Sequence, residues 1–171
     1  AYTIKELASY SFLLEHFYIV DETTSMTKQD LNGTKLVTMD LSAKLGKEEP
    51  LVLIYHTHGS ETYKKVNGKE GSVIEVGTAL TKELENVYGI KTVHDKSVYD
   101  MVDGQLDRNA AYNFAGDSVE AALRKNPSVK VVIDLHRDSV ENNIHLRTKV
   151  NGKSAAQIMF FNGVSRLASK G

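Results

Sequence analysis

The sequence predicts an α/β fold: a mostly parallel, twisted sheet with helices on both faces and a β-hairpin near the carboxyl end. Residues 51–55 and 129–135 are apolar runs with β-branched members, which is typical of buried parallel strands. A stretch of helical period at 72–87 separates the first run from a further strand candidate at 89–94. Strand, helix and strand over this span have the size of a right-handed βαβ unit, so we expect parallel strands.

The amino-terminal lead-in, residues 1–49, is expected to pack on the same single domain, which spans residues 1–171. Its first helix should begin after Thr3, because Thr3 and Glu6 have the spacing of a capping box. Apolar residues of near-helical period extend this helix to about residue 16.

Two short extended segments are expected in the rest of the lead-in. Residues 17–20 are too few and too rich in β-branched side chains for a helix, which favours a strand at a sheet edge. Asn32 and Gly33 give a turn signal, and residues 35–39 form a short extended candidate.

The best-defined helix follows the first core strand. Ser72 and Glu75 repeat the capping-box spacing, and Gly89 is a stop signal at the other end. A second helix is expected from about residue 118 to residue 125, just before the strand at 129–135.

A hairpin is expected after the last core strand. Residues 144–150 and 154–161 are two extended candidates, and Asn151 and Gly152 between them are typical of a tight turn. No internal repeat or low-complexity tract interrupts the chain.

Composition limits the classes of partner. The chain has 171 residues, 41% hydrophobic and 25% charged, which is ordinary for one globular domain. A net charge of −1 gives no field for a polyanion, so we expect no nucleic-acid partner.

The absence of cysteine excludes disulfides and thiolate catalysis. No run is long enough to span a bilayer and no methionine begins the chain, so we expect a fragment whose membrane contact comes only through an anchor outside it.

Histidines stand at the carboxyl ends of two predicted strands. His56 and His58 follow the strand at 51–55, and His136 follows the strand at 129–135. Because the carboxyl ends of parallel strands meet at one edge of a sheet, we expect His58 and His136 to lie close together and to bind a metal ion. His56 shares a face with His58 if the strand continues, so it could be a second ligand there or lie just behind one. A single histidine at a strand end is more often only a hydrogen-bonded residue, and it is the combination that favours a metal site.

A carboxylate would complete a zinc site. Zinc commonly takes two histidines and one carboxylate and leaves a fourth position for water. Glu61, three residues after His58, is the preferred candidate. Glu70 and Glu75 are rivals, although Glu75 is better explained as the capping partner of Ser72.

Polar neighbours of His136 supply further candidates. Asp134 lies two residues before His136 and so on the same side of the strand, where it could either hold the second imidazole nitrogen or cap a loop. Arg137 could form a rim salt bridge with Asp138, or bind a substrate carboxylate or an oxyanion. Ser60 lacks the second glycine of a nucleophile elbow, which argues against a serine hydrolase.

The remaining histidines have no partner at a spacing that indicates a site. They are His16, His94 and His145, and we interpret all three as structural.

Several segments together resemble the stage II sporulation protein P family. They are LVLIYHTHGSETY at 51–63, SVIEVG at 72–77, GIKTVHD at 89–95 and VIDLHRD at 132–138, with HFYIVD at 16–21 as a similar lead-in. The resemblance covers nearly the whole chain. It implies an amidase-like fold, with His58 and His136 as metal histidines and Glu61 as the carboxylate.

The same resemblance implies an activity and a setting. It implies a zinc-dependent peptidoglycan hydrolase related to the N-acetylmuramoyl-L-alanine amidases, which cuts between muramic acid and the stem peptide and also has endopeptidase activity. It implies work between the mother-cell and forespore membranes during engulfment, beside the transglycosylase stage II sporulation protein D.

The catalytic base is expected to lie elsewhere. Related amidases carry a further catalytic glutamate in a late strand, and this chain stops at residue 171 before such a segment. Arg137 and His56 are the catalytic candidates within the chain. The alternative function is a non-catalytic module that binds peptidoglycan or a protein partner, with a structural metal or none. A metal-dependent deacetylase or phosphoesterase would fit the ligands but not the motifs.

Overall fold

The computed structural model describes residues 1–20, 25–43, 48–63, 71–140, 144 and 146–161. The chain divides into two compact units, Ala1–Gly46 and Lys47–Gly171. The packing of the lead-in on the second unit stays a prediction.

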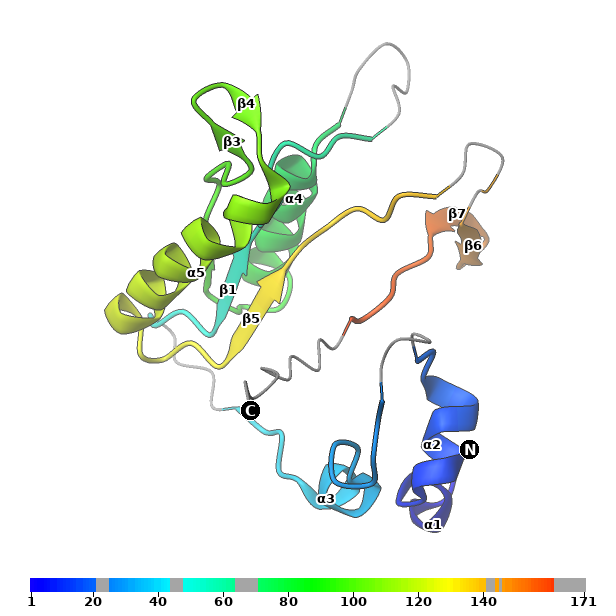
Figure 1. Cartoon of the computed structure of the whole chain (residues 1–171). Coiled ribbons are helices and arrows are strands. Elements are labelled where there is room, and N and C mark those ends of the chain that lie inside the picture. Colours follow the sequence, from blue (N-terminus) through cyan, green and yellow to red (C-terminus); the bar gives the residue numbers. More distant parts are fainter. Residues whose placement is uncertain (21–24, 44–47, 64–70, 141–143, 145, 162–171) are drawn as a thin grey trace, which may run out of the picture. The chain divides into compact units, whose positions relative to one another are not determined.

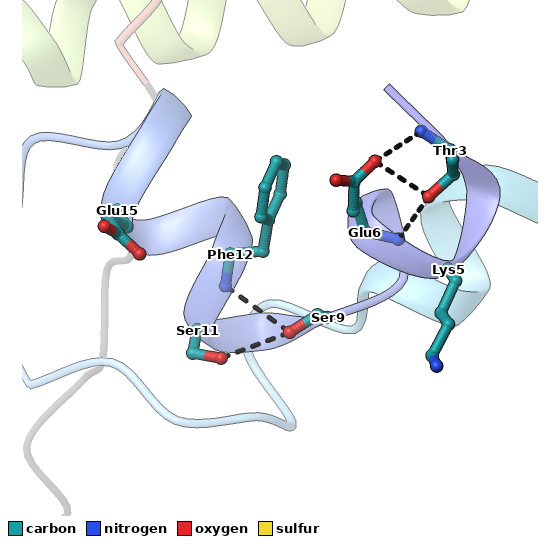
Figure 2. A pocket seen from close by; sticks show the side chains of 7 residues that line it. All are labelled: Thr3, Lys5, Glu6, Ser9, Ser11, Phe12 and Glu15. Atoms are coloured by element: carbon teal, nitrogen blue, oxygen red, sulfur yellow. Dashed lines mark hydrogen bonds between the residues drawn. The ribbon is translucent and has the colours of Figure 1, made fainter. Parts of the chain in front are cut away.

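In its described residues the first unit contains three short helices, α1 (Ile4–Leu7), α2 (Tyr10–Phe17) and α3 (Gly33–Thr38). The predicted capping box starts α1: Glu6 accepts from the backbone N–H of Thr3 (2.7 Å), and the Thr3 hydroxyl accepts from the N–H of Glu6 (3.2 Å) (Figure 2). The single helix expected to residue 16 is wrong, because the Ser9 side chain accepts from Phe12 and starts a second helix.

Both extended segments expected in the lead-in are also wrong. Helix α2 runs to Phe17, and residues 18–20 belong to neither helix nor strand. Residues 35–38 are helical, because the Asn32 side chain accepts from the backbone N–H of Lys35 (2.9 Å) and caps α3. The turn signal was therefore a helix start, since asparagine favours both positions.

The second unit is built on the predicted parallel sheet. Strands β1 (Val52–Tyr55), β2 (Thr92–His94) and β5 (Val131–Asp134) lie in the order β2-β1-β5, and both pairs are parallel. Figure 1 shows β1 and β5 side by side. Val52, Leu53 and Ile54 of the central strand are only 5%, 1% and 0% exposed. The strand is therefore covered on both faces, as its continuous apolar run predicts.

Helices cover the two faces of this sheet. Gly77 of α4 (Val73–Asn86) lies against the ring of His56, which directly follows β1. Tyr55, one residue earlier, packs against Ala111 and Ala115 of α5 (Arg108–Lys125). Because successive residues of an extended strand point to opposite faces, the contacts place α4 and α5 on opposite sides. The α/β prediction is confirmed.

Helix α4 begins at its predicted capping box. The Ser72 N–H donates to Glu75 (2.9 Å), and the Ser72 hydroxyl accepts from the Glu75 N–H (3.1 Å). Gly89, just after the helix, has a φ of +66°, a conformation that costs glycine little. Both ends of α4 are thus fixed by local sequence.

Replacing Ser72 with alanine should therefore lower the free energy of unfolding by about 1 kcal/mol, because one helix donor loses its acceptor. Urea unfolding followed by circular dichroism measures this change. Ser154→Ala, at an exposed serine in strand β7 (Lys153–Ala156), is the matched control and should change stability little. Equal effects of the two substitutions would contradict the capping role.

Helix α5 starts ten residues before its expected beginning, so that boundary was wrong. Asp107 caps it by accepting from the N–H groups of Asn109 (3.1 Å) and Ala110 (3.0 Å). The buried residues in this half are Ala111 and Ala115, whose small side chains give little hydrophobic periodicity.

Two antiparallel hairpins lie outside the parallel sheet in the described part of the second unit. Strands β3 (Met101–Val102) and β4 (Gln105–Leu106) form a small antiparallel hairpin that the sequence did not indicate. The expected hairpin near the carboxyl end is confirmed as β6 (Arg147–Val150) and β7, which are shorter than expected. Its turn has φ values of 50° at Asn151 and 77° at Gly152, as a tight Asn-Gly turn requires.

Candidate metal centre

Three of the predicted site residues meet at the carboxyl ends of β1 and β5. His58, Glu61 and His136 each offer a ligand atom, and these atoms all lie within 4.8 Å of one another. His58 and Glu61 lie in the loop after β1, and His136 follows β5. The parallel pairing of Tyr55 with Asp134 brings the two segments to the same edge.

Glu61 lies between the two histidines. One of its carboxylate oxygens, Oε1, is 4.0 Å from Nδ1 of His58, and the other, Oε2, is 3.9 Å from Nδ1 of His136. The imidazole centroids of His58 and His136 are 5.1 Å apart, with their planes at 78°. The side chain of Glu61 is 5% exposed, against 11% for His58 and 33% for His136, so the cluster opens to solvent on the His136 side.

Asp134 contacts the far nitrogen of His136. Its Oδ2 lies 3.0 Å from Nε2 of His136, which holds a proton on Nε2 and leaves Nδ1 turned toward Glu61. This hydrogen bond raises the pKa of His136, and burial opposes the shift. The same carboxylate also accepts from the N–H and the hydroxyl of Thr57, so Asp134 has the contacts of both roles, orienting the imidazole and holding the loop after β1.

The donor set fits a zinc ion. Two imidazole nitrogens and one carboxylate are ligands that zinc commonly takes, with a further position for water. Nε2 of His58 is buried and has no hydrogen-bond partner in the structure described here. A buried polar atom without a partner is costly, so both the chemistry and this vacant nitrogen agree with a bound cation.

Two arginines approach Glu61. The backbone N–H of Arg137 donates to Oε2 of Glu61 (3.0 Å), and a guanidinium nitrogen of Arg108 donates to Oε1 (3.5 Å). Arg108 was missed by the sequence analysis. No local motif marks Arg108, because its contact with Glu61 depends on where the β3–β4 hairpin places the start of α5 relative to the loop after β1.

Part of the Arg137 side chain has no hydrogen-bond partner among the described residues. Its Nε is buried without a hydrogen-bond partner, and Nη1 reaches the backbone carbonyl of Asp138 (3.5 Å). The Asp138 carboxylate accepts instead from the N–H of Ser139 (2.8 Å). Within the described part of the chain, the geometry does not show a rim salt bridge between Arg137 and Asp138.

His56 lies apart from the cluster. It is fully buried, donates from Nδ1 to the carbonyl oxygen of Leu135 (2.9 Å), and has Nε2 2.9 Å from Nε2 of His94. A neutral His56 therefore accepts at Nε2 from His94. The register of β1 and β2 sets the contact between His56 and His94, and no spacing in the sequence reveals it. A catalytic role of His56 stays a prediction.

Acid should weaken this buried pair. Burial lowers the pKa of His56, and burial together with the charges of His56 and Lys96 lowers that of His94, below the ordinary histidine value of 6.5. Their stabilising contribution is therefore present above pH 6.5 and is lost as pH falls, by about 1.4 kcal/mol per pH unit for each proton taken up on unfolding.

The measurement is urea unfolding of metal-free protein from pH 7 to pH 5, beside His94→Asn. The stability advantage of the wild type over His94→Asn should shrink as the pH falls. His136, whose pKa shift has the opposite sign, is common to both proteins and cancels. An advantage that grows on acidification would contradict the neutral pair.

Of the two rival carboxylates, the structure describes Glu75, which is used elsewhere. Glu75 accepts from the N–H of Ser72 in the α4 cap. Glu70 and His145 lie outside the described residues. His16 lies in the first unit, where its Nδ1 is 3.0 Å from the carbonyl oxygen of Phe12. The pocket drawn in Figure 2 is also in the first unit and is lined by none of the predicted site residues.

Fold and site together define a parallel α/β protein with a His–Glu–His cluster of metal-ligand type at the carboxyl ends of its strands. The chain belongs to the stage II sporulation protein P family, whose model matches residues 5–168, and is thus a member of a sporulation family. It is similar to the stage II sporulation protein P of Bacillus subtilis (strain 168), with 27% identity over 127 residues. That match covers 68% of this chain and 31% of the relative's length. No solved structure matches the chain.

Proposed function

We propose that the chain is the catalytic part of a zinc-dependent peptidoglycan hydrolase. It cleaves the amide bond between N-acetylmuramic acid and L-alanine of the stem peptide, and it also cuts peptide cross-links. The observation that carries the proposal is the convergence of His58, Glu61 and His136, in a chain of this sporulation family.

His58, Glu61 and His136 would hold the zinc ion. When bound, zinc supplies Lewis acidity toward an amide carbonyl and lowers the pKa of a water ligand to about 7. Two neutral imidazoles and one carboxylate leave the site with a formal charge of +1. This charge suits a carbonyl oxygen that gains negative charge during attack by water.

The surrounding residues orient the ligands and bind the substrate. Asp134 keeps the proton of His136 on Nε2 and so presents Nδ1. The N–H of Arg137 fixes one oxygen of Glu61. The guanidinium of Arg137 would bind an anion, which in this reaction is the oxyanion or a carboxylate of the stem peptide.

The setting of the reaction is part of the proposal. The full-length protein would be anchored in a membrane and would act on peptidoglycan between the mother-cell and forespore membranes, beside the transglycosylase stage II sporulation protein D. Membership of the sporulation family supports this setting. Among the residues described, no helix combines the length and the apolar character needed to cross a bilayer.

The test combines zinc analysis with digestion of purified cell-wall sacculi. Wild-type protein should bind about one zinc ion per chain and release stem peptides. His58→Ala and His136→Ala should lose both properties, because each removes a ligand. His16→Ala is the matched control, at an exposed histidine of the first unit, and should keep both.

Two outcomes would count against the proposal. Zinc binding that survives in both His58→Ala and His136→Ala would contradict the metal site. Where the chain binds stoichiometric zinc but releases no stem peptides, the digestion is repeated with a longer chain of the same protein, and zinc without release there would favour the alternative, a non-catalytic binding module.

A further inference from the structure

A buried aspartate holds the loop between two of the candidate metal ligands. Asp100 is 0% exposed, and both of its carboxylate oxygens accept from Ser60: Oδ1 from the backbone N–H (3.1 Å) and Oδ2 from the hydroxyl (2.6 Å). Ser60 lies between His58 and Glu61 in the chain. A buried carboxylate is costly unless its oxygens are hydrogen-bonded. Because solvent does not reach Asp100, the two bonds from Ser60 satisfy its oxygens.

The same arrangement occurs on the other side of His58. Thr57 donates its backbone N–H to Oδ1 of Asp134 (2.9 Å) and its hydroxyl to Oδ2 (2.5 Å). Asp134 is the residue that also contacts His136. His58 is thus flanked by two hydroxyl residues, each bound through two hydrogen bonds to a carboxylate from a different part of the chain.

The segment that carries Asp100 reaches the loop at a second point. The Asp100 carbonyl accepts from the N–H of Asp107 (2.9 Å), the cap of α5. Helix α5 begins at Arg108, which contacts Glu61. One segment therefore contacts Ser60 through a carboxylate and Glu61 through a guanidinium.

We propose that Asp100 is a positioning residue for the metal centre. Through Ser60 it fixes the backbone between His58 and Glu61, so that both ligands face His136. A metal site needs its donors held to within about 0.5 Å, and a loop outside helix and strand does not supply this by itself. The inference rests on the proposed metal site and adds to it a residue that never touches the ion.

The test measures zinc affinity in the whole chain by competition with a chromophoric chelator. Asp100→Ala should weaken binding by roughly 10–100-fold, the usual cost of losing an outer support of a ligand. Ser60→Ala should weaken it less, because the Ser60 N–H still reaches Asp100. In the Asp100→Ala background, Ser60→Ala should have no further effect, since the partner of the hydroxyl is already gone.

Controls separate positioning from general stability. Asp117→Ala makes the same change on the exposed surface of α5 and should leave zinc affinity at the wild-type value. Urea unfolding of each metal-free variant shows whether it is folded. If Asp100→Ala does not fold, Ser60→Ala decides, because it removes only one hydroxyl. Absorption of the cobalt-substituted proteins reports ligand geometry directly and should change in both variants.

The outcomes distinguish this inference from the function on which it rests. If folded Ser60→Ala and Asp100→Ala bind zinc with the wild-type affinity, the positioning role alone is overturned. Independent, additive effects of the two substitutions also overturn it. A wild-type chain that binds no zinc overturns the metal site, and the positioning role with it.

Discussion

Glu61→Gln is expected to reduce zinc affinity by more than the roughly 10–100-fold that loss of an outer hydrogen bond to a ligand costs. The Glu61 carboxylate lies about midway between Nδ1 of His58 and Nδ1 of His136 and is 5% exposed. Glutamine keeps the shape of the side chain but removes its negative charge, so the change isolates the ligand's charge. Competition with a chromophoric chelator measures the affinity.

The rival carboxylates provide the controls. Glu75→Gln makes the same change in the α4 cap and should leave zinc affinity at the wild-type value, while it weakens the cap. Glu70→Gln should also bind zinc normally. Loss of zinc affinity in either control, with Glu61→Gln unaffected, would show that the wrong carboxylate is assigned here.

Gly77→Ala is expected to destabilise the second unit by roughly 2–5 kcal/mol, because overpacking and a lost buried hydrogen bond add up. A Cβ at position 77 would lie 2.6 Å from Nε2 of His94 and 2.7 Å from Nε2 of His56. Neither ring can move away freely, since the two are bonded to each other and His56 also binds the carbonyl of Leu135. The methyl group must therefore break the histidine pair or push α4 off the sheet.

Gly116→Ala is the matched control within a helix. Apart from its chain neighbours and the adjacent backbone of α5, no atom lies within 4 Å of where a Cβ at Gly116 would be, so alanine there should stabilise the protein by about 0.5–1 kcal/mol. Urea unfolding of metal-free protein compares the two substitutions, whose effects should have opposite signs. A stabilising Gly77→Ala would contradict the close packing of α4 on the histidines.

The core of the fold followed from local sequence. The apolar runs at 51–55 and 129–135 predicted strands β1 and β5, because strands buried on both faces have no polar side to show. Capping signals at Thr3 and Ser72 predicted the starts of α1 and α4, since the bonds involved span three residues.

The errors arose where local preference was ambiguous. Asn32 could begin a turn or a helix. The structure has a helix, and Gly33 at its start lies so near α1 that a Cβ there would be 2.6 Å from the carbonyl oxygen of Ala8. Residues 17–20 have β-branched side chains but no neighbouring strand within the described part of the first unit. Propensity alone cannot supply a strand's partner.

The candidate site divides in the same way. His58, Glu61 and His136 were predictable because the carboxyl ends of parallel strands share one edge, so position in the fold followed from position in the sequence. Asp100 and Arg108 were not, because their contacts depend on the path of the chain between β2 and α5. Such contacts are set by tertiary structure, so no spacing of residues in the sequence indicates them.

Anomalous diffraction at the zinc edge, from crystals of the zinc-loaded chain, tests the central claim most directly. We expect one strong peak about 2.0–2.2 Å from a nitrogen of His58, a nitrogen of His136 and an oxygen of Glu61. A peak bound by other residues, with these three side chains free of metal, would contradict it.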